Sequence, residues 1–428
     1  MKRIVKFGGK GKVEKAQTVE ICRLQEYGAL ALDAKAAIIQ ELIPLGLMHI
    51  LEVIEEEVVS LAGDRYRRNG KSSYDRWGKQ QGSVYIKDQR IPIKYQRVRD
   101  TNNNREAPLK SYGMFQRPTG PADEKLLNRI LHGISCGNYR MCSEAIPGAL
   151  SLSPSTVSRR YIAASEGKLR ELRERSLEQY DFVAMIMDGK AFGDDEIIIA
   201  IGVTIEGVKV ILGIIQAASE NQTVCKDFLN GLVERGLKYE QGLLCIVDGA
   251  RGFHKAIKDV FGARGVVQRC QWHKRENILE YLPKGVRNRF RQRLQAAYRE
   301  EDYTRARTAF AAIKKDLRTI NESAVNSLEE GFEETLTVHR LGVRKALRRS
   351  FTTTNMIESV NSLVGQRTDK VDYWKNSNQK QRWVATSLLD IEGRLNRANG
   401  YKHLQELRSA LQREIQMAKD KQKEAAAA

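Results

Sequence analysis

The chain has few of the features that mark membrane, secreted or zinc-binding proteins. No stretch of its 428 residues approaches the roughly 18 to 20 uncharged apolar residues of a membrane-spanning helix, so we expect no membrane insertion. The basic N-terminus is followed by no apolar segment, so no secretory signal is visible and we expect a cytoplasmic protein. The six cysteines form no CxxC pair, which argues against a disulfide framework or a cysteine-rich zinc site.

Basic residues, in contrast, are abundant. The chain has 72 Lys and Arg against 53 Asp and Glu, a net charge of +19, together with 41% hydrophobic residues, enough for packed cores. A charge of this size concerns binding partners more than fold, and the usual polyanions are nucleic acid and acidic membrane surfaces.

The N-terminal part divides into a helical and a basic, aromatic region. Apolar spacing predicts a helical region over residues 1–62, with helix from about residue 15 and a break near Pro44. Over 63–118, basic residues alternate with aromatics, and a hairpin is predicted around Asp88 and Gln89. Trp77 and Arg90 there suit base stacking and phosphate contact, although an ordinary solvated strand surface has the same composition. The Asn-, Pro- and Gly-rich residues 101–125 suggest a linker.

Residues 119–178 have the pattern of a helix-turn-helix DNA-binding domain. EKLLNRILHG and NYRMCSEAIPGAL are predicted helices, and Ser153 is a natural N-cap for a third that starts at Pro154. Small hydroxyl residues and paired arginines near that N-terminus suit base-edge and phosphate contacts, although a generic helical hairpin would look similar. The predicted DNA contacts are Ser155, Thr156, Ser158, Arg159 and Arg160.

Residues 179–282 predict the first part of an α/β core. Three β-branched runs follow one another from Tyr180, and two strand–helix units come next, with an S-x-x-Q capping box at Ser219. The order β-β-β-α-β-α-β-α is that of the RNase H-like fold, in which the first and fourth strands are parallel neighbours.

Two aspartates fall at corresponding places in this order. Asp188 is predicted to end the first strand and Asp248 to end the fourth, so their carboxylates would converge at one edge of the sheet. Such a pair suits Mg²⁺ or Mn²⁺, although Asp-Gly after a strand is also a common turn. A third carboxylate is needed for a two-metal site, and Glu358, near the start of a predicted helix, is the candidate. Its spacing from Asn355 equally fits a capping box.

The motifs around these acids resemble one family. MDGK at Asp188, VDGARGFHKAI at Asp248, RCQWHKREN at Cys270 and TTNMIESVNS at Glu358 together resemble the bacterial Mutator-type insertion-sequence transposases. The resemblance implies a DDE enzyme in which Asp188, Asp248 and Glu358 bind two Mg²⁺ or Mn²⁺ ions. It also implies that His273, which belongs to a C-x-x-H motif, positions the metal site or the scissile phosphate. A structural zinc site is not expected there, because it would need a second pair of Cys or His ligands.

The resemblance also implies a helical insertion between the second Asp and the Glu, which are 110 residues apart. We place it at residues 283–347, with the last part of the core at 348–395 and a C-terminal helix at 396–428. That helix could serve a dimer contact or core packing. An apolar stripe at Val286, Phe290, Leu294 and Tyr298 leaves arginines on the other faces of one inserted helix. Predicted DNA contacts, which could also be solvated surface, are Arg287, Arg291, Arg344, Lys345 and Arg348. Trp272 is predicted to stack on DNA, although a core position is equally consistent with the sequence.

Together these features predict a transposase that binds the terminal inverted repeats of an insertion sequence. It would cut the DNA and join it to target DNA with divalent metal, acting as a homodimer or larger homo-oligomer associated with the bacterial nucleoid. The alternatives are a helix-turn-helix regulator without catalysis and an RNase H-like nuclease that cuts without joining.

Overall fold

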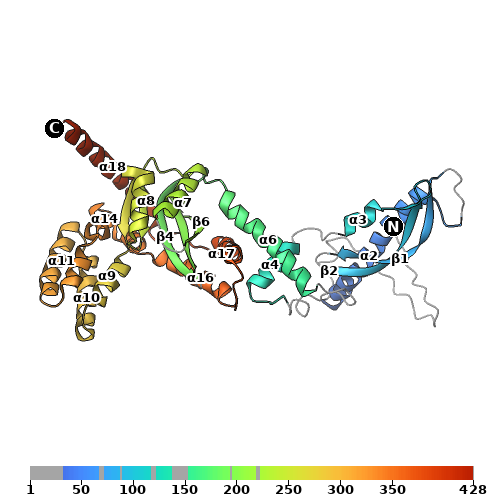
Figure 1. The fold of residues 1–428 in the computed structure, drawn as a ribbon, viewed down its shortest axis with the longest axis horizontal. Helices are drawn as coiled ribbons and strands as arrows, with labels where there is room; N and C mark the ends of the chain where they lie inside the picture. The colour runs from blue at the N-terminus through green and yellow to red at the C-terminus, as the bar shows by residue number, and fades with distance from the viewer. Residues whose placement is uncertain are drawn as a thin grey trace. The chain divides into compact units, whose positions relative to one another are not determined.

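The computed structural model describes residues 32–66, 72–86, 89–116, 122–136, 153–192, 195–217 and 222–427. The chain forms two compact units, and the boundary between their main parts falls between Arg160 and Tyr161, inside helix α6 (Pro154–Glu174). Figure 1 traces the elements of both along the chain. The finer division into seven regions stays a prediction.

The first unit contains a three-stranded antiparallel sheet covered by a long helix. Its elements are α2 (Leu32–Ala62), β1 (Tyr74–Ile86), β2 (Gln89–Asp100), β3 (Arg105–Ala107), α3 (Lys110–Phe115) and α4 (Ala122–Leu131). The strand order is β1-β2-β3, and Ile86 pairs with Gln89, which confirms the predicted hairpin. Ile54 and Val58 of α2 pack against Val84 and Val98 of the sheet, because alternate strand residues face the helix.

Two expectations for this unit are wrong. Helix α2 continues through Pro44, because a proline removes one backbone hydrogen bond from a helix but need not end it. Residues 101–116 are not a linker: they form a turn, β3 and α3. The Glu57 carboxylate of α2 accepts hydrogen bonds from the backbone amides of Lys110 and Ser111, both at 2.8 Å, which fixes the start of α3. Residues 117–121 lie outside the described part.

The second unit is built on a five-stranded mixed sheet. Its first elements are β4 (Phe182–Phe192), β5 (Asp195–Thr204), β6 (Lys209–Ala217), α7 (Gln222–Glu234), β7 (Leu243–Val247), α8 (Arg251–Phe261), the short helix η1 (Gly262–Arg264), β8 (Gly265–Arg269) and α9 (Gln271–Glu280). The predicted element order is confirmed, and the sheet order is β6-β5-β4-β7-β8. Strand β4 is antiparallel to β5 and parallel to β7. The last strand is shorter than predicted, because Cys270 already caps α9. Ser219 lies outside the described residues.

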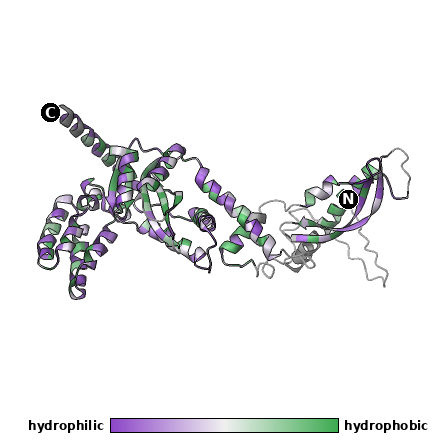
Figure 2. Ribbon diagram, viewed as in Figure 1, coloured by the Kyte–Doolittle hydropathy of each residue, from purple (hydrophilic) through white to green (hydrophobic). Residues whose placement is uncertain are grey.

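Both faces of this sheet are buried. Met185 and Met187 pack towards α7 and α8, whereas Ile186 packs with residues of α6, α16 (Asn355–Thr368), α17 (Ser377–Glu392) and α18 (Leu404–Ala427). Figure 2 shows the hydrophobic character of these strands. Burial on both faces accounts for the continuous apolar runs that made the strands visible in the sequence.

Between α9 and α16 the chain forms only helices and turns. The part up to Leu336 has its own core, whereas Val338, Leu347 and Phe351 pack into the core of the sheet. The helices are α10 (Lys284–Arg299), α11 (Tyr303–Arg318), α12 (Glu322–Glu329), α13 (Phe332–Thr335), α14 (Thr337–Arg340) and α15 (Lys345–Phe351). The predicted apolar stripe of α10 lies in the first of these cores, with Phe290 and Leu294 buried and Val286 and Tyr298 partly buried.

The C-terminal helix α18, which follows the short helix η2 (Tyr401–His403), packs into the sheet's core. Leu404, Leu407 and Leu411 are fully buried, so this apolar face serves core packing. Cys225, Cys245 and Cys270 are also buried, as expected for small apolar side chains. None of the helices in the described residues is long and apolar enough to cross a membrane.

Candidate active site

Asp188 and Asp248 lie at the same level of two neighbouring parallel strands. Ile186 of β4 pairs with Ile246 of β7, and each aspartate comes two residues later in its strand's direction. Asp248 directly follows β7, as predicted. Asp188 does not end its strand, because β4 continues to Phe192 along β5. The parallel pairing with β7 ends before Asp188, so both aspartates still lie where the two strands separate.

The Asp188 carboxylate is buried and contacts the middle of α16. It is only 9% exposed, and Asn361 Nδ2 donates to its Oδ2 at 3.3 Å. Lys190 Nζ in turn donates to the Asn361 backbone carbonyl at 2.8 Å, which ties β4 to α16. Asn361 is missing from the sequence prediction, although its position three residues after Glu358 puts both on one helix face.

Glu358 lies in the first turn of α16, where the helix was predicted to begin. Its Oε1 accepts a hydrogen bond from Thr354 Oγ1 at 2.8 Å, and Thr354 is completely buried. Thr354, and not Asn355, is the N-cap residue, and its side chain makes no capping bond to the backbone. The capping box between Asn355 and Glu358 is therefore not formed. Thr354 is a second residue that the sequence did not identify.

The C-x-x-H motif connects the strand ends to α16. The Cys270 amide donates to the Val247 carbonyl at 2.7 Å, immediately before Asp248. The Thr354 amide donates to Cys270 Sγ at 3.4 Å, and Thr354 Oγ1 is 3.4 Å from His273 Nδ1. The motif thus lies between the strand end that carries Asp248 and the helix that carries Glu358, and Cys270 packs in the interior.

The ionisation of these groups is coupled. Burial, reinforced by the charges of Asp248 and Glu358 and opposed by His273, raises the pKa of Asp188 to about 7. The hydrogen bond to Cys270, together with nearby Asp188 and Asp248, raises the pKa of His273 to about 9 despite its burial. Burial opposes the ionised form of Cys270, but hydrogen bonds from His273 and Thr354 outweigh it and lower the thiol pKa. The structure therefore brings Asp188, Asp248, Glu358 and His273 within electrostatic reach of one another.

This acidic group, Asp188, Asp248 and Glu358, is not a preformed metal cage. Among the described residues, no three His, Cys, Asp or Glu side chains are arranged as a group that could hold a metal ion. Three carboxylates with hard oxygen donors nevertheless have the chemistry that Mg²⁺ and Mn²⁺ prefer. The predicted metal site stays a prediction.

Comparison with known proteins gives the family. Residues 14–398 match the family described as transposase, Mutator family. The chain belongs to the Mutator family of transposases. It is 30% identical over 281 residues to the transposase for insertion sequence element IS6120 of Mycolicibacterium smegmatis, which covers 64% of this chain and 85% of that protein. It is 25% identical over 381 residues to the transposase for ISRM5 of Rhizobium meliloti, covering 85% and 92%.

The structure describes only part of the helix-turn-helix domain predicted for this Mutator-family transposase. Helices α4 and α6 are present, and Ser153 Oγ accepts from the Thr156 amide at 3.2 Å, which confirms the predicted N-cap. Residues 137–152, with the predicted middle helix, lie outside the described part. On α6, Ser155 and Arg159 are exposed, while Thr156, Ser158 and Arg160 are half-buried.

In the first unit of the transposase, the two predicted contact residues lie on paired strands. Trp77 is exposed, and the Arg99 guanidinium stacks over its ring at 4.0 Å from the centroid. Arg90 is exposed and donates to Ser83 Oγ at 2.6 Å.

The predicted cationic contacts of the helical segment differ in their surroundings. Arg287 donates to the Leu282 and Glu280 carbonyls, and Arg291 pairs with Glu276 at 3.0 Å. Arg344 pairs with Glu406 at 2.9 Å, and Arg348 donates to the Glu300 and Glu301 carbonyls. Lys345 is exposed, and no ion pair with another described residue is present. Trp272 is exposed beside His273.

Proposed function

We propose that the chain is a DDE transposase with an RNase H-like core, in which Asp188, Asp248 and Glu358 bind two Mg²⁺ or Mn²⁺ ions. The observation that supports this most is the register of β4 and β7, which puts two aspartates at one sheet edge beside the start of α16. The raised pKa of Asp188 adds to it, because acids that repel one another in a buried place suit a bound cation.

The donor set fits such ions, because all three side chains offer carboxylate oxygens. When bound, the ions would activate the attacking oxygen, first of water and then of a DNA 3′-hydroxyl, and stabilise the leaving oxygen. The Thr354 hydroxyl restrains Glu358, and the Asn361 amide restrains Asp188. His273, protonated at neutral pH, offers positive charge to a DNA phosphate.

The exposed residues of α6 and the first unit's basic surface would bind the terminal inverted repeats. Because transposition acts on two element ends, we propose that the working form is a homodimer or larger assembly. The two alternatives use parts of the same molecule. A regulator would need the basic surface and not the acidic group, and a nuclease would use the acidic group without joining.

The test compares wild type with Asp188→Asn on labelled terminal-repeat DNA and a target plasmid, with Mg²⁺ or EDTA. We expect Asp188→Asn to lower cleavage and joining at least about 10³-fold while DNA binding persists, because only a carboxylate supplies the charge an ion needs. The matched control is Asp372→Asn, an exposed aspartate outside the acidic group, which should keep wild-type rates.

Each result separates the three candidates. Joined products that need Mg²⁺ and disappear in Asp188→Asn support the transposase. Cleavage without joining supports the nuclease. Binding with no products in any metal-containing reaction supports the regulator and contradicts the proposal.

A further inference from the structure

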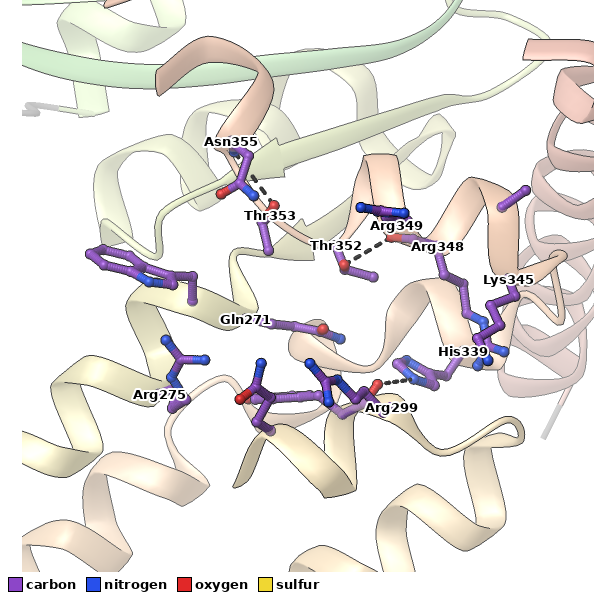
Figure 3. A pocket seen from close by; sticks show the side chains of 14 residues that line it. Gln271, Arg275, Arg299, His339, Lys345, Arg348, Arg349, Thr352, Thr353 and Asn355 are labelled. Carbon is purple, nitrogen blue, oxygen red and sulfur yellow. Dashed lines mark hydrogen bonds between the residues drawn. The ribbon is translucent and has the colours of Figure 1, made fainter. Parts of the chain in front are cut away.

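A pocket of about 730 Å³ lies beside the acidic group and plays no part in the function proposed so far. Its walls come from α9, α10, α14, α15 and the start of α16. Figure 3 shows Gln271, Arg275, Lys345 and Asn355 arranged around it. The volume is in the range of pockets that enclose small ligands, about 300 to 1,000 Å³, and is far too small for a DNA duplex.

The pocket is strongly cationic. Its described lining contains five Arg and Lys side chains and no Asp or Glu; they are Arg275, Arg299, Lys345, Arg348 and Arg349. Arg275 pairs with Glu276, and Arg348 donates to two carbonyls. For Arg299, Lys345 and Arg349, which are exposed, no acidic partner is found among the described residues. Such a concentration of unpaired charge favours an anionic ligand.

The pocket adjoins the residues that contact the acidic group. Gln271 and Trp272 line it, and the next residue is His273. On the other wall, Thr353 and Asn355 flank Thr354, whose hydroxyl is bonded to Glu358. A DNA strand with one phosphate at the acidic group would therefore reach this pocket with its adjoining nucleotide.

The lining also offers groups for a base. The Trp272 side chain is 42% exposed, and its ring meets His273 edge to face, with centroids 4.8 Å apart. Base stacking on aromatic rings needs no particular sequence, because every base has a flat face. His339 is 4% exposed, and its Nε2 donates to the Tyr298 carbonyl at 3.0 Å. His339 therefore forms part of the pocket wall, and Trp272 is the group that can stack with a base.

We propose that this pocket binds one unpaired nucleotide of the DNA strand that leaves the acidic group, with the base on Trp272 and the adjoining phosphates on Lys345 and Arg349. The proposal rests on the proposed function for the position of the reacting phosphate. An unpaired nucleotide fits the pocket's size, its free cations and its aromatic wall together, whereas the backbone of an intact duplex would use only the cations.

The test uses the full chain in EDTA, so that no metal-dependent step contributes. Binding of a fluorescent thymidine single strand and of a duplex is compared for wild type, Lys345→Ala with Arg349→Ala, and Trp272→Ala. The matched control is Lys315→Ala with Arg318→Ala, which removes two exposed cations from α11, outside the pocket. A single strand carrying iodouracil is crosslinked in parallel, and the attached residue is identified by mass spectrometry.

We expect both pocket variants to weaken single-strand binding about tenfold, with duplex binding and the control within about twofold of wild type. The crosslink should map to Trp272 and be lost in Lys345→Ala with Arg349→Ala, while Trp272→Phe keeps the affinity. An equal loss in the control, an equal loss for duplex, or a crosslink elsewhere would overturn the proposal. Strand joining by the Asp188→Asn variant would instead overturn the proposed function. The crosslink would then still show whether the pocket binds a nucleotide.

Discussion

Helices α10 and α15 both carry several basic residues, and the structure surrounds them differently. On α10, Arg291 pairs with Glu276, and Arg293 pairs with Asp316 at 2.6 Å. On α15, Lys345 and Arg349 face the pocket, and no acidic partner is found for them within the described residues. Arg291 and Arg293 therefore attach the first helix to α9 and α11, and of its arginines only the last, Arg299, reaches the pocket, whereas the second helix leaves Lys345 and Arg349 available.

The difference shows how a net charge of +19 should be interpreted. A guanidinium already paired with a carboxylate contributes little to a polyanion's binding, because the neighbouring acid repels the same phosphate. Two helices of similar composition can thus differ in function. The relevant quantity is unpaired charge on a surface that the ligand reaches.

Reversing the unpaired charges should have the largest effect. We expect Lys345→Glu with Arg349→Glu to lower strand joining about 100-fold or more, because two phosphate contacts become repulsive. Joining is measured on terminal-repeat DNA at fixed salt. The same reversal at Lys315 and Arg318 should lower joining less than about fivefold. Similar losses in both variants would show that only total charge matters, and the contrast between the helices would fail.

Removing the acid that pairs with α10 should make this helix resemble α15. Glu276 pairs with both Arg275 and Arg291, and their hydrogen bonds lower its pKa despite burial. We expect Glu276→Gln to tighten DNA binding about threefold and to steepen its salt dependence, since two cations lose their partner. Fluorescence anisotropy across a salt series measures both. Unchanged or weaker binding would contradict this explanation.

The smallest effect on DNA binding is expected for an arginine whose ion pair connects two helices. Arg293→Ala removes the ion pair with Asp316, and should cost less than about 1 kcal/mol of unfolding free energy because the pair is partly exposed. DNA affinity should stay within about twofold of wild type. Denaturant unfolding and anisotropy on one preparation test both. A larger loss of affinity than of stability would mean that α10 contacts DNA through this residue.

The sequence predicted the elements of the core better than their details. Strand runs such as IIIAIGV are visible because burial on both faces needs continuous apolar residues, and Asp248 follows directly from the end of one run. The extension of β4 past Asp188 was not predictable, because it depends on pairing with β5 and not on β4 itself.

Long-range partners explain the remaining differences. Glu57 holds the start of α3 from more than 50 residues away, so the Asn- and Pro-rich stretch looked like a linker. Thr354 contacts both Cys270 and Glu358, and nothing in local spacing distinguishes it from its neighbours Thr352 and Thr353. For the same reason the arginines of α10 looked available, since their partners come from α9 and α11.

The position of α16 after the helical segment has a consequence for synthesis. Asp188 and Asp248 leave the ribosome well before Glu358, and most of the helices between them form a core of their own. Because contacts between distant parts of a chain form only after both parts exist, the acidic group is completed late. A product that stops before residue 355 would keep the predicted DNA-binding regions and lack the third carboxylate. Such a truncated chain would also lack α16, α17 and α18, so one face of the sheet would lose the helices that bury it.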